Sequence, residues 1–310
     1  MAERADYHRA DYHPPLRESI PNILGDYGSR PENHWDRSQA DCHRIDDGQA
    51  YDIPALRQSL KGLTIGGEII YAEELNSTND YIKQARGSLS NGAVVLAGRQ
   101  LAGRGRNGRV WYSESRAGIF VSVLLKAGRR EPSFTLAAGL AVTRAVRLLG
   151  LPAGIKWPND CVIDGKKFAG ILTETQGMGD FLAVGIGVNV NNSAFPEDIA
   201  EKAVSLALAA GRRFSRQDVL ADILRQLNYV YKPFMEGGFA VLRDEYLRHC
   251  VTVGAEVRLG TPLREGSSET ARAVDISPSG GLVVVNGSGA RREVLSGEIS
   301  VRGLDGNYTA

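Results

Sequence analysis

The sequence has few cysteines, no long apolar run and almost no net charge. Its 310 residues include three cysteines, Cys42, Cys161 and Cys250. No two of them form a C-x-x-C pair, so a disulfide framework is excluded and a reducing compartment fits. The longest apolar stretch, residues 136–149, is interrupted by two arginines and is shorter than the roughly 20 residues that cross a bilayer. The N-terminus has no apolar segment of the kind that a secretory signal requires. We therefore expect a cytoplasmic protein without a membrane span.

The small net charge argues against one class of partner. Lys and Arg number 37 and Asp and Glu number 36, a formal charge of +1, whereas dedicated nucleic-acid binders usually carry a basic excess. The balance is uneven along the chain. Residues 1–50 hold 6 Arg, no Lys and 10 Asp or Glu, a charge of −4 that leaves +5 on the remainder. The neutral total therefore hides a cationic body.

The first 50 residues are also poor in apolar side chains. Only seven of them are Val, Ile, Leu, Met, Phe or Trp, too few to offset the entropy lost when a chain becomes ordered. They contain four of the five histidines but no metal-ligand spacing. We predict that residues 1–50 form a disordered acidic extension and that the chain has no metal site.

From residue 51 the pattern becomes that of a folded protein with both helices and strands. Apolar runs predict strands over residues 63–72, 93–97, 118–125, 154–157, 161–163, 170–175 and 181–190. Helical spacing and N-cap residues predict helices over residues 80–85, 133–149, 218–231 and 239–249. From residue 251, short strands separated by Gly, Ser and Pro turns are typical of small β-barrels. We therefore expect an α+β domain over residues 51–250 and a small β-barrel domain over residues 251–310.

The densest chemical signal is QLAGRGRNGRVW, residues Gln100–Trp111. Three glycines alternate there with three arginines: Gly103, Gly105 and Gly108 with Arg104, Arg106 and Arg109. Glycine lets the backbone fold tightly around a ligand, and guanidinium groups supply paired donors for carboxylate and phosphate. The segment is neither a P-loop, which closes on Gly-Lys-Ser/Thr, nor a dinucleotide-binding fingerprint. By itself it is compatible with a loop that closes over an anion, a flexible segment that contacts nucleic acid, or a solvated turn.

Two further motifs accompany strands of the predicted sheet. KWPND, Lys156–Asp160, has the composition of a turn between strands, and Lys166 and Lys167 lie on the next turn. These lysines concentrate cationic donors that could reach a phosphate or polarise a carboxyl oxygen, although a plain hairpin around a packed Trp157 accounts for the same residues. In GIGVNVN, Asn189 interrupts an apolar strand. It needs hydrogen-bond partners, which either the fold or a ligand would supply.

Together, and in this order, the motifs resemble those of the biotin–protein ligase family. The resemblance rests on STN at Ser77–Asn79, GRGRxGRxW at Gly103–Trp111, KWPND at Lys156–Asp160, KxAGIL at Lys167–Leu172, GxGxN at Gly185–Asn189 and SGEIS at Ser296–Ser300. It extends from about Ile65 to Arg302. It implies an α+β fold: a class II aminoacyl-synthetase-like mixed sheet with helices, followed by a small SH3-like β-barrel.

The resemblance also implies an activity. Members of the family use ATP, with Mg²⁺ as the expected helper ion, to convert biotin to biotinoyl-5'-AMP. They then transfer biotin to a lysine of the biotin carboxyl carrier domain of a carboxylase. Because the biotin carboxylate must approach the α-phosphate, the first step needs cationic groups that offset the repulsion. No DNA or membrane partner is expected. A homodimer formed through a sheet edge is common in the family, and the sequence does not decide it.

By similarity, individual residues take roles in binding and catalysis. The biotin site would consist of Ser77, Thr78, Asn79, Gln100, Gly103, Arg104, Arg106, Lys167, Gly170 and Ile171. The ATP site would consist of Arg106, Arg109, Trp111, Lys156, Asn159, Lys167 and Asn189. The catalytic groups would be Lys167, Arg104, Arg106 and Asp160. Lys167 would hold the biotin carboxyl oxygen and the α-phosphate, and Asp160 would orient or deprotonate the acceptor lysine.

The sequence departs from the family pattern in two places. Asn107 stands where a further arginine is often found, which makes the loop slightly less cationic. Bifunctional relatives carry an N-terminal DNA-binding domain, and residues 1–50 lack its helix–turn–helix periodicity. We therefore expect a ligase without repressor function.

Three alternative functions remain open at this point. A lipoate-protein ligase or octanoyltransferase shares the fold but binds an apolar acyl chain, and the polar set Ser77, Thr78 and Gln100 favours biotin. An RNA-binding module is disfavoured by neutrality and by the lack of interleaved aromatic residues. A non-catalytic biotin-binding protein is disfavoured by Lys167.

Overall fold

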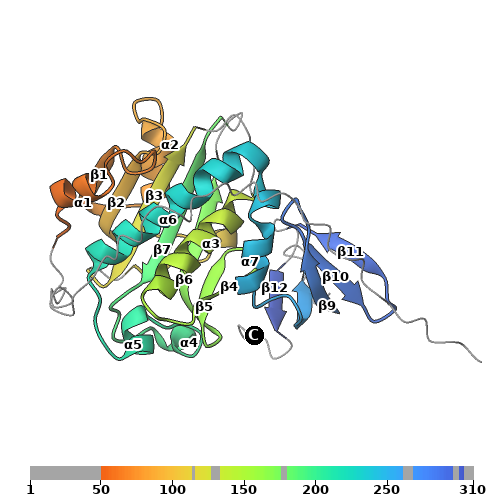
Figure 1. Ribbon diagram of the computed structural model, residues 1–310. Helices are drawn as coiled ribbons and strands as arrows, with labels where there is room; N and C mark the ends of the chain where they lie inside the picture. The colour runs from red at the N-terminus through yellow and green to blue at the C-terminus, as the bar shows by residue number, and fades with distance from the viewer. Residues whose placement is uncertain are drawn as a thin grey trace, which may run out of the picture. The chain divides into compact units, whose positions relative to one another are not determined.

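A computed structural model describes residues 50–113, 116–126, 133–175, 180–260, 268–295 and 300–303 (Figure 1). The expectations for the acidic extension therefore lie outside the described residues, except at residue 50, and so does most of the SGEIS motif. All described residues belong to one compact unit. The division between domains at residue 250 remains a prediction.

Seven strands form a mixed sheet. They are β1 (Ile69–Leu75), β2 (Val94–Gln100), β3 (Gly118–Leu125), β4 (Gly154–Lys156), β5 (Asp160–Ile163), β6 (Lys166–Glu174) and β7 (Leu182–Asn189). Their order is β1-β2-β3-β7-β6-β5-β4. β1 and β2 are parallel, and the other neighbouring pairs are antiparallel. Every residue of the central strand β3 is buried, which agrees with a sequence that is apolar except at Ser122.

Helices cover both faces of this sheet. α3 (Phe134–Leu148) and α6 (Arg216–Gly237) pack together along one face (Figure 1), and α2 (Thr78–Ala85) packs on the other. Successive residues of β2 point to opposite sides: Val94 belongs to the core under α3, and Val95 belongs to a smaller core with Ile82 of α2. The remaining helices are α1 (Ile53–Ser59), α4 (Glu197–Ala200), α5 (Leu206–Ala210) and α7 (Arg243–His249), with 3-10 turns η2 (Arg106–Gly108) and η3 (Phe239–Val241). Among the described residues no helix is both long and apolar enough to cross a bilayer.

A second sheet follows α7. It consists of β8 (Glu256–Gly260), β9 (Ser268–Ile276), β10 (Leu282–Asn286), β11 (Arg291–Val294) and β12 (Ser300–Gly303). The order is β11-β10-β9-β8-β12, with every neighbouring pair antiparallel. The prediction of an α+β fold, in which a mixed sheet with helices is followed by a small all-β part, is confirmed.

The second sheet is linked to the first through Trp157. This side chain is 1% exposed, and its indole N–H donates to the carbonyl of Gly280 over 2.9 Å. Its backbone N–H donates to Oγ1 of Thr252, also over 2.9 Å. The KWPND turn is therefore fixed from both the mixed sheet and the segments around the second sheet.

Several predicted boundaries shift in the structure. The first strand begins at Ile69 rather than at residue 63, because the chain turns at Gly66, whose φ is +101°. The α6 helix continues past Tyr231 and through Pro233 to Gly237. The short helices α1, α4 and α5 were not predicted.

Candidate active site

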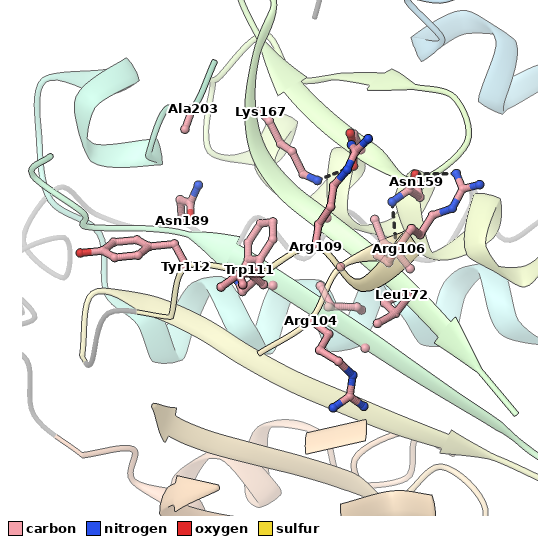
Figure 2. Close-up of a pocket in the computed structure, with 18 of the residues that line it drawn as sticks. Arg104, Arg106, Arg109, Trp111, Tyr112, Asn159, Lys167, Leu172, Asn189 and Ala203 are labelled. Atoms are coloured by element: carbon pink, nitrogen blue, oxygen red, sulfur yellow. Dashed lines mark hydrogen bonds and ion pairs between the residues drawn. The ribbon is translucent and has the colours of Figure 1, made fainter. Parts of the chain in front are cut away.

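The predicted site residues surround one cavity of about 530 Å³. All of them line it except Gly103: Ser77, Thr78, Asn79, Gln100, Arg104, Arg106, Arg109, Trp111, Lys156, Asn159, Asp160, Lys167, Gly170, Ile171 and Asn189. They come from the start of α2, the end of β2, the glycine–arginine segment, the β4–β5 turn and strands β6 and β7. Segments far apart in the sequence thus meet where the sheet and the loops join (Figure 2).

One end of the cavity carries neutral polar groups. Ser77 caps α2, and the next residue, Thr78, donates its backbone N–H to Oε1 of Gln100 over 2.9 Å. Behind them, the hydroxyl of the fully buried Ser122 lies 2.7 Å from Oγ1 of Thr78 and 2.6 Å from Oδ1 of Asn79. Sequence reasoning missed Ser122, although a lone hydroxyl in the apolar strand GIFVSVLL was a signal. Hydroxyl and amide groups of this kind suit an uncharged ligand that both donates and accepts hydrogen bonds.

The side-chain amide of Asn79 is hydrogen-bonded to other residues of the protein. Its amide nitrogen donates to the carbonyl of Leu172 over 3.1 Å and to a carboxylate oxygen of Glu174 over 2.7 Å. A Cβ at Gly185 would lie 2.7 Å from its Oδ1, so this glycine gives the amide room. Asn79 therefore holds α2 against β6 and β7.

Two paired glycines on neighbouring strands leave room for a flat ring at the floor of the cavity. Gly170 of β6 pairs with Gly187 of β7, and the indole of Trp111 lies against both. A Cβ at Gly187 would come within 2.4 Å of Cε2 of the indole, and one at Gly170 within 3.0 Å of its Cζ3. The ammonium of Lys167 lies 5.1 Å from the centroid of the same ring, at a distance typical of a cation–π contact.

Cationic side chains gather beside this floor. Nζ of Lys167 lies 2.6 Å from a carboxylate oxygen of Asp160, and Lys156 lines the cavity with 6% of its surface exposed. Arg106 lines the cavity and donates to Oδ1 of Asn159 over 3.1 Å (Figure 2). Burial lowers the pKa of Arg106 from its usual value, and the charge of Asp160 opposes that shift. A guanidinium remains protonated under these conditions, so the cavity holds fixed positive charge.

Arg104 takes a different direction from the other cations. Its guanidinium makes two hydrogen bonds to Asp80 in the first turn of α2, of 2.7 and 2.8 Å, and Figure 2 shows it turned away from Lys167. These bonds lower the pKa of Asp80 to about 2. Gly103 precedes Arg104 in the sequence and packs closely against Ser113: a Cβ at Gly103 would come within 2.6 Å of Oγ of Ser113.

A wall of the cavity comes from a segment that the sequence motifs did not include. Four of its lining residues, from residues 195–202, are Phe195, Asp198, Ile199 and Lys202. The segment is held in place by Lys167, whose backbone N–H donates to the carbonyl of Lys202 over 2.8 Å and whose carbonyl accepts from the N–H of Val204 over 3.0 Å. Asn189 donates its side-chain amide to the carbonyl of Val204 over 3.3 Å, so it too contacts this wall.

A cavity with a polar neutral end, a flat floor and several converging cations defines an enzyme site suited to a ligand that carries a carboxylate or phosphate. Comparison with known proteins gives the family. Residues 71–191 match the biotin/lipoate A/B protein ligase family, and residues 252–302 match the biotin protein ligase C-terminal domain.

Individual relatives agree with these matches. The bifunctional ligase/repressor BirA of Bacillus subtilis is 32% identical over 79% of this chain and 78% of its own length. The biotin–[acetyl-CoA-carboxylase] ligase of Mycobacterium tuberculosis is 32% identical over 72% of this chain and 86% of its own length. The structure of the biotin protein ligase from Aquifex aeolicus with biotin and ATP superimposes with a TM-score of 0.69 at 34% identity, covering 76% of this chain and 98% of that one. The chain belongs to the biotin–protein ligase family.

Proposed function

We propose that this protein is an ATP-dependent biotin–protein ligase. In the first step the carboxylate of biotin attacks the α-phosphorus of ATP, which forms biotinoyl-5'-AMP and releases pyrophosphate. In the second step the amine of an acceptor lysine attacks the acyl carbon, which forms an amide and releases AMP. The observation that carries the proposal is the convergence of Lys167, Lys156 and Arg106 beside a cavity whose other end holds Ser77, Thr78 and Gln100.

The polar end is assigned to the ureido ring of biotin. This ring presents one carbonyl and two N–H groups, which match the hydroxyl and amide groups of Ser77, Thr78 and Gln100. The backbone at Gly170 and the side chain of Ile171 line the cavity next to it and would contact the apolar part of biotin. Asn79 is assigned an indirect role, because its amide is already bonded to Leu172 and Glu174.

The cationic end is assigned to the reacting groups. Two anions, the biotin carboxylate and the α-phosphate, have to approach each other, and fixed positive charge at the point of approach stabilises the transition state. Lys167 is assigned to the carboxyl oxygen and the α-phosphate. Arg106, Arg109 and Lys156 are assigned to the phosphates. Trp111 offers a flat face suited to adenine.

Asn159 and Asn189 complete the nucleotide side of the cavity. Asn159 already accepts a hydrogen bond from Arg106, so it would fix the direction of that guanidinium. Asp160 is assigned to the transfer step, in which a carboxylate can orient the acceptor amine or accept its proton. Its carboxylate oxygen lies 2.6 Å from Nζ of Lys167, so binding of the adenylate would compete for Lys167 and make Asp160 available.

The donor set does not fit a resident metal ion. The described residues contain no group of three or more His, Cys, Asp or Glu that could hold one, and the carboxylates that line the cavity are Asp160 and Asp198. We propose that Mg²⁺ enters with ATP, bound to its phosphates.

The acceptor proposed for this enzyme is the biotin carboxyl carrier domain of a carboxylase. We place the reaction in the cytoplasm, and we propose no DNA or membrane partner. A homodimer is compatible with the open edge of β1, which pairs within the described sheet only with β2.

The experiment that tests the function is ATP–pyrophosphate exchange with biotin or with lipoate added. We expect exchange with biotin and little or none with lipoate, because the Ser77, Thr78 and Gln100 end favours a ureido ring over an apolar chain. Exchange with lipoate alone would contradict the proposal and favour the lipoate-ligase alternative.

A further inference from the structure

The glycine–arginine segment forms a short hairpin over the cavity. The N–H of Gly105 donates to the carbonyl of Arg109 over 2.7 Å, and the N–H of Trp111 donates to the carbonyl of Gly103 over 2.9 Å. The 3-10 turn η2 forms the tip. Arg104 therefore lies near the base of the hairpin and Arg106 at its tip. These two arginines have different surroundings.

The hairpin is attached to two different elements, α2 and the β4–β5 turn. At the base, Nη1 and Nη2 of Arg104 each donate to one oxygen of Asp80 in α2, over 2.8 and 2.7 Å. At the tip, Arg106 donates to Oδ1 of Asn159 over 3.1 Å. In Figure 2 the two guanidinium groups point in different directions, and only that of Arg106 lies near Asn159. The parallel pair at the base has the geometry of a strong, direction-specific contact.

Asp80 is itself held in place. Nζ of Lys83, one turn further along α2, lies 2.8 Å from Oδ1 of Asp80 and 3.1 Å from Oε1 of Glu174. Glu174 lies 3.9 Å from Arg104, too far for a hydrogen bond. Asp80 is therefore the carboxylate that determines the direction of Arg104, and α2 also carries the Thr78 and Asn79 end of the cavity.

We propose that Asp80 is a positioning residue, which holds the hairpin closed over the cavity through Arg104. The proposal rests on the proposed ligase function. It makes Arg104 a tether and leaves Arg106 as the arginine that meets the reacting anions, in place of the catalytic role that the family resemblance assigns to Arg104. Without Asp80 the base of the hairpin loses both bonds to α2, while the bond of Arg106 to Asn159 still holds the tip. Biotin and its adenylate then leave the cavity more readily.

A double-mutant cycle tests the proposal. The variants are Asp80→Asn, Arg104→Ala and the two combined, and the control is Glu269→Gln, which removes one carboxylate of an exposed ion pair with Arg292 in the second sheet. The KM for biotin is expected to rise on the order of fivefold in Asp80→Asn, the size typical of a partly exposed charge pair. The kcat of pyrophosphate exchange stays within about twofold, because the group acts on closure rather than on the reacting atoms.

The combined variant shows whether Asp80 acts through Arg104 or independently of it. If Asp80 acts through Arg104, adding Asp80→Asn to Arg104→Ala changes the KM for biotin no further. Asp80→Glu, which keeps the charge, restores part of the affinity, and release of free biotinoyl-5'-AMP into solution rises in Asp80→Asn. Additive effects of the two substitutions, or a larger loss of kcat in Arg104→Ala than in Asp80→Asn, would overturn the tether and return Arg104 to the reacting centre.

A second measurement keeps the test independent of the ligase function. Hydrogen exchange of the amides of Gly105 and Trp111, followed in the protein without substrates, reports opening of the hairpin. Faster exchange in Asp80→Asn than in the wild type and in Glu269→Gln supports the tether, and equal exchange refutes it. Wild-type protein without biotin-dependent pyrophosphate exchange would refute the proposed function, and the amide measurement would still decide the role of Asp80.

Discussion

The substitution Gly187→Ala tests how the floor of the cavity works. The added Cβ would lie 2.4 Å from Cε2 and 2.5 Å from Nε1 of the Trp111 indole, whereas carbon atoms in contact are about 3.5–4.0 Å apart. The indole therefore has to retreat by about 1 Å. The backbone at Gly187 cannot move away instead of the indole, because Gly187 pairs in register with both β3 and β6.

The size of the effect follows from this displacement. Overpacking costs roughly 1–3 kcal/mol, and Trp111 is partly exposed, so it can swing outward and the lower end of that range applies. About 1.4 kcal/mol corresponds to a factor of ten in binding. Since Trp111 is assigned to the adenine side, we expect the KM for ATP to rise about tenfold, with the free energy of unfolding lowered by about 1 kcal/mol.

A graded series of glycine variants makes this prediction specific. Gly170→Ala would place its Cβ 3.0 Å from the indole and from the end of the flexible Lys167 side chain, so its effect should be smaller. Gly87→Ala, where no atom lies within 4 Å of the new Cβ, is the control and should leave the KM for ATP unchanged. A wild-type KM in Gly187→Ala, measured by pyrophosphate exchange, would refute the placement of Trp111 in the nucleotide site.

Four further predictions follow from individual contacts. Lys167→Ala should lower the rate of pyrophosphate exchange about 10²–10³-fold, while calorimetry still detects biotin binding; full exchange would remove Lys167 from its role. The hydrogen bonds from Arg104 lower the pKa of Asp80 from 3.8 to about 2. The ionised Asp80 carboxylate therefore stabilises the folded state fully above about pH 4, and this stabilisation is lost as the pH falls toward 2. After allowance for solvent screening, denaturation should show Asp80→Asn about 1 kcal/mol less stable than wild type at pH 5 and equal to it near pH 2. Trp157→Phe leaves the Gly280 carbonyl without its indole donor and should lower the free energy of unfolding by about 1–3 kcal/mol, and an unchanged urea midpoint would contradict this. Asn107, with φ of +56°, should tolerate glycine but raise the KM for ATP when replaced by valine.

The elements that the sequence predicted well are those determined by local chemistry. The helix expected over residues 80–85 is present as α2 and begins two residues earlier, at Thr78, because the hydroxyl of Ser77 accepts from the N–H of Asp80 and caps the helix there. β3 spans Gly118–Leu125, the predicted bounds, because a continuous apolar run at the centre of a sheet needs no alternation. Pattern alone failed for β1, because the apolar run from residue 63 includes Gly66, where the chain turns before the strand begins at Ile69.

The features of the site that the sequence did not predict depend on contacts between segments far apart in the chain. The cavity wall at residues 195–202 depends on backbone hydrogen bonds of Lys167 to Lys202 and Val204, which leave no periodic signal in the sequence. The direction of Arg104 depends on Asp80, which lies 24 residues earlier on α2. The sequence shows both charges, but only the fold brings them together. The departure at Asn107 also has a structural reason, since asparagine adopts positive φ more readily than arginine.

Labelling of an acceptor protein tests the central claim most directly. The 310-residue chain is incubated with ATP, biotin and a biotin carboxyl carrier domain, and the carrier is analysed by mass spectrometry while AMP and pyrophosphate are quantified. The account predicts one biotinyl group on one lysine, with one AMP and one pyrophosphate formed for each group transferred, and loss of labelling when biotin is replaced by lipoate. An unlabelled carrier in the presence of biotin and ATP, or a carrier labelled by lipoate instead, would contradict it.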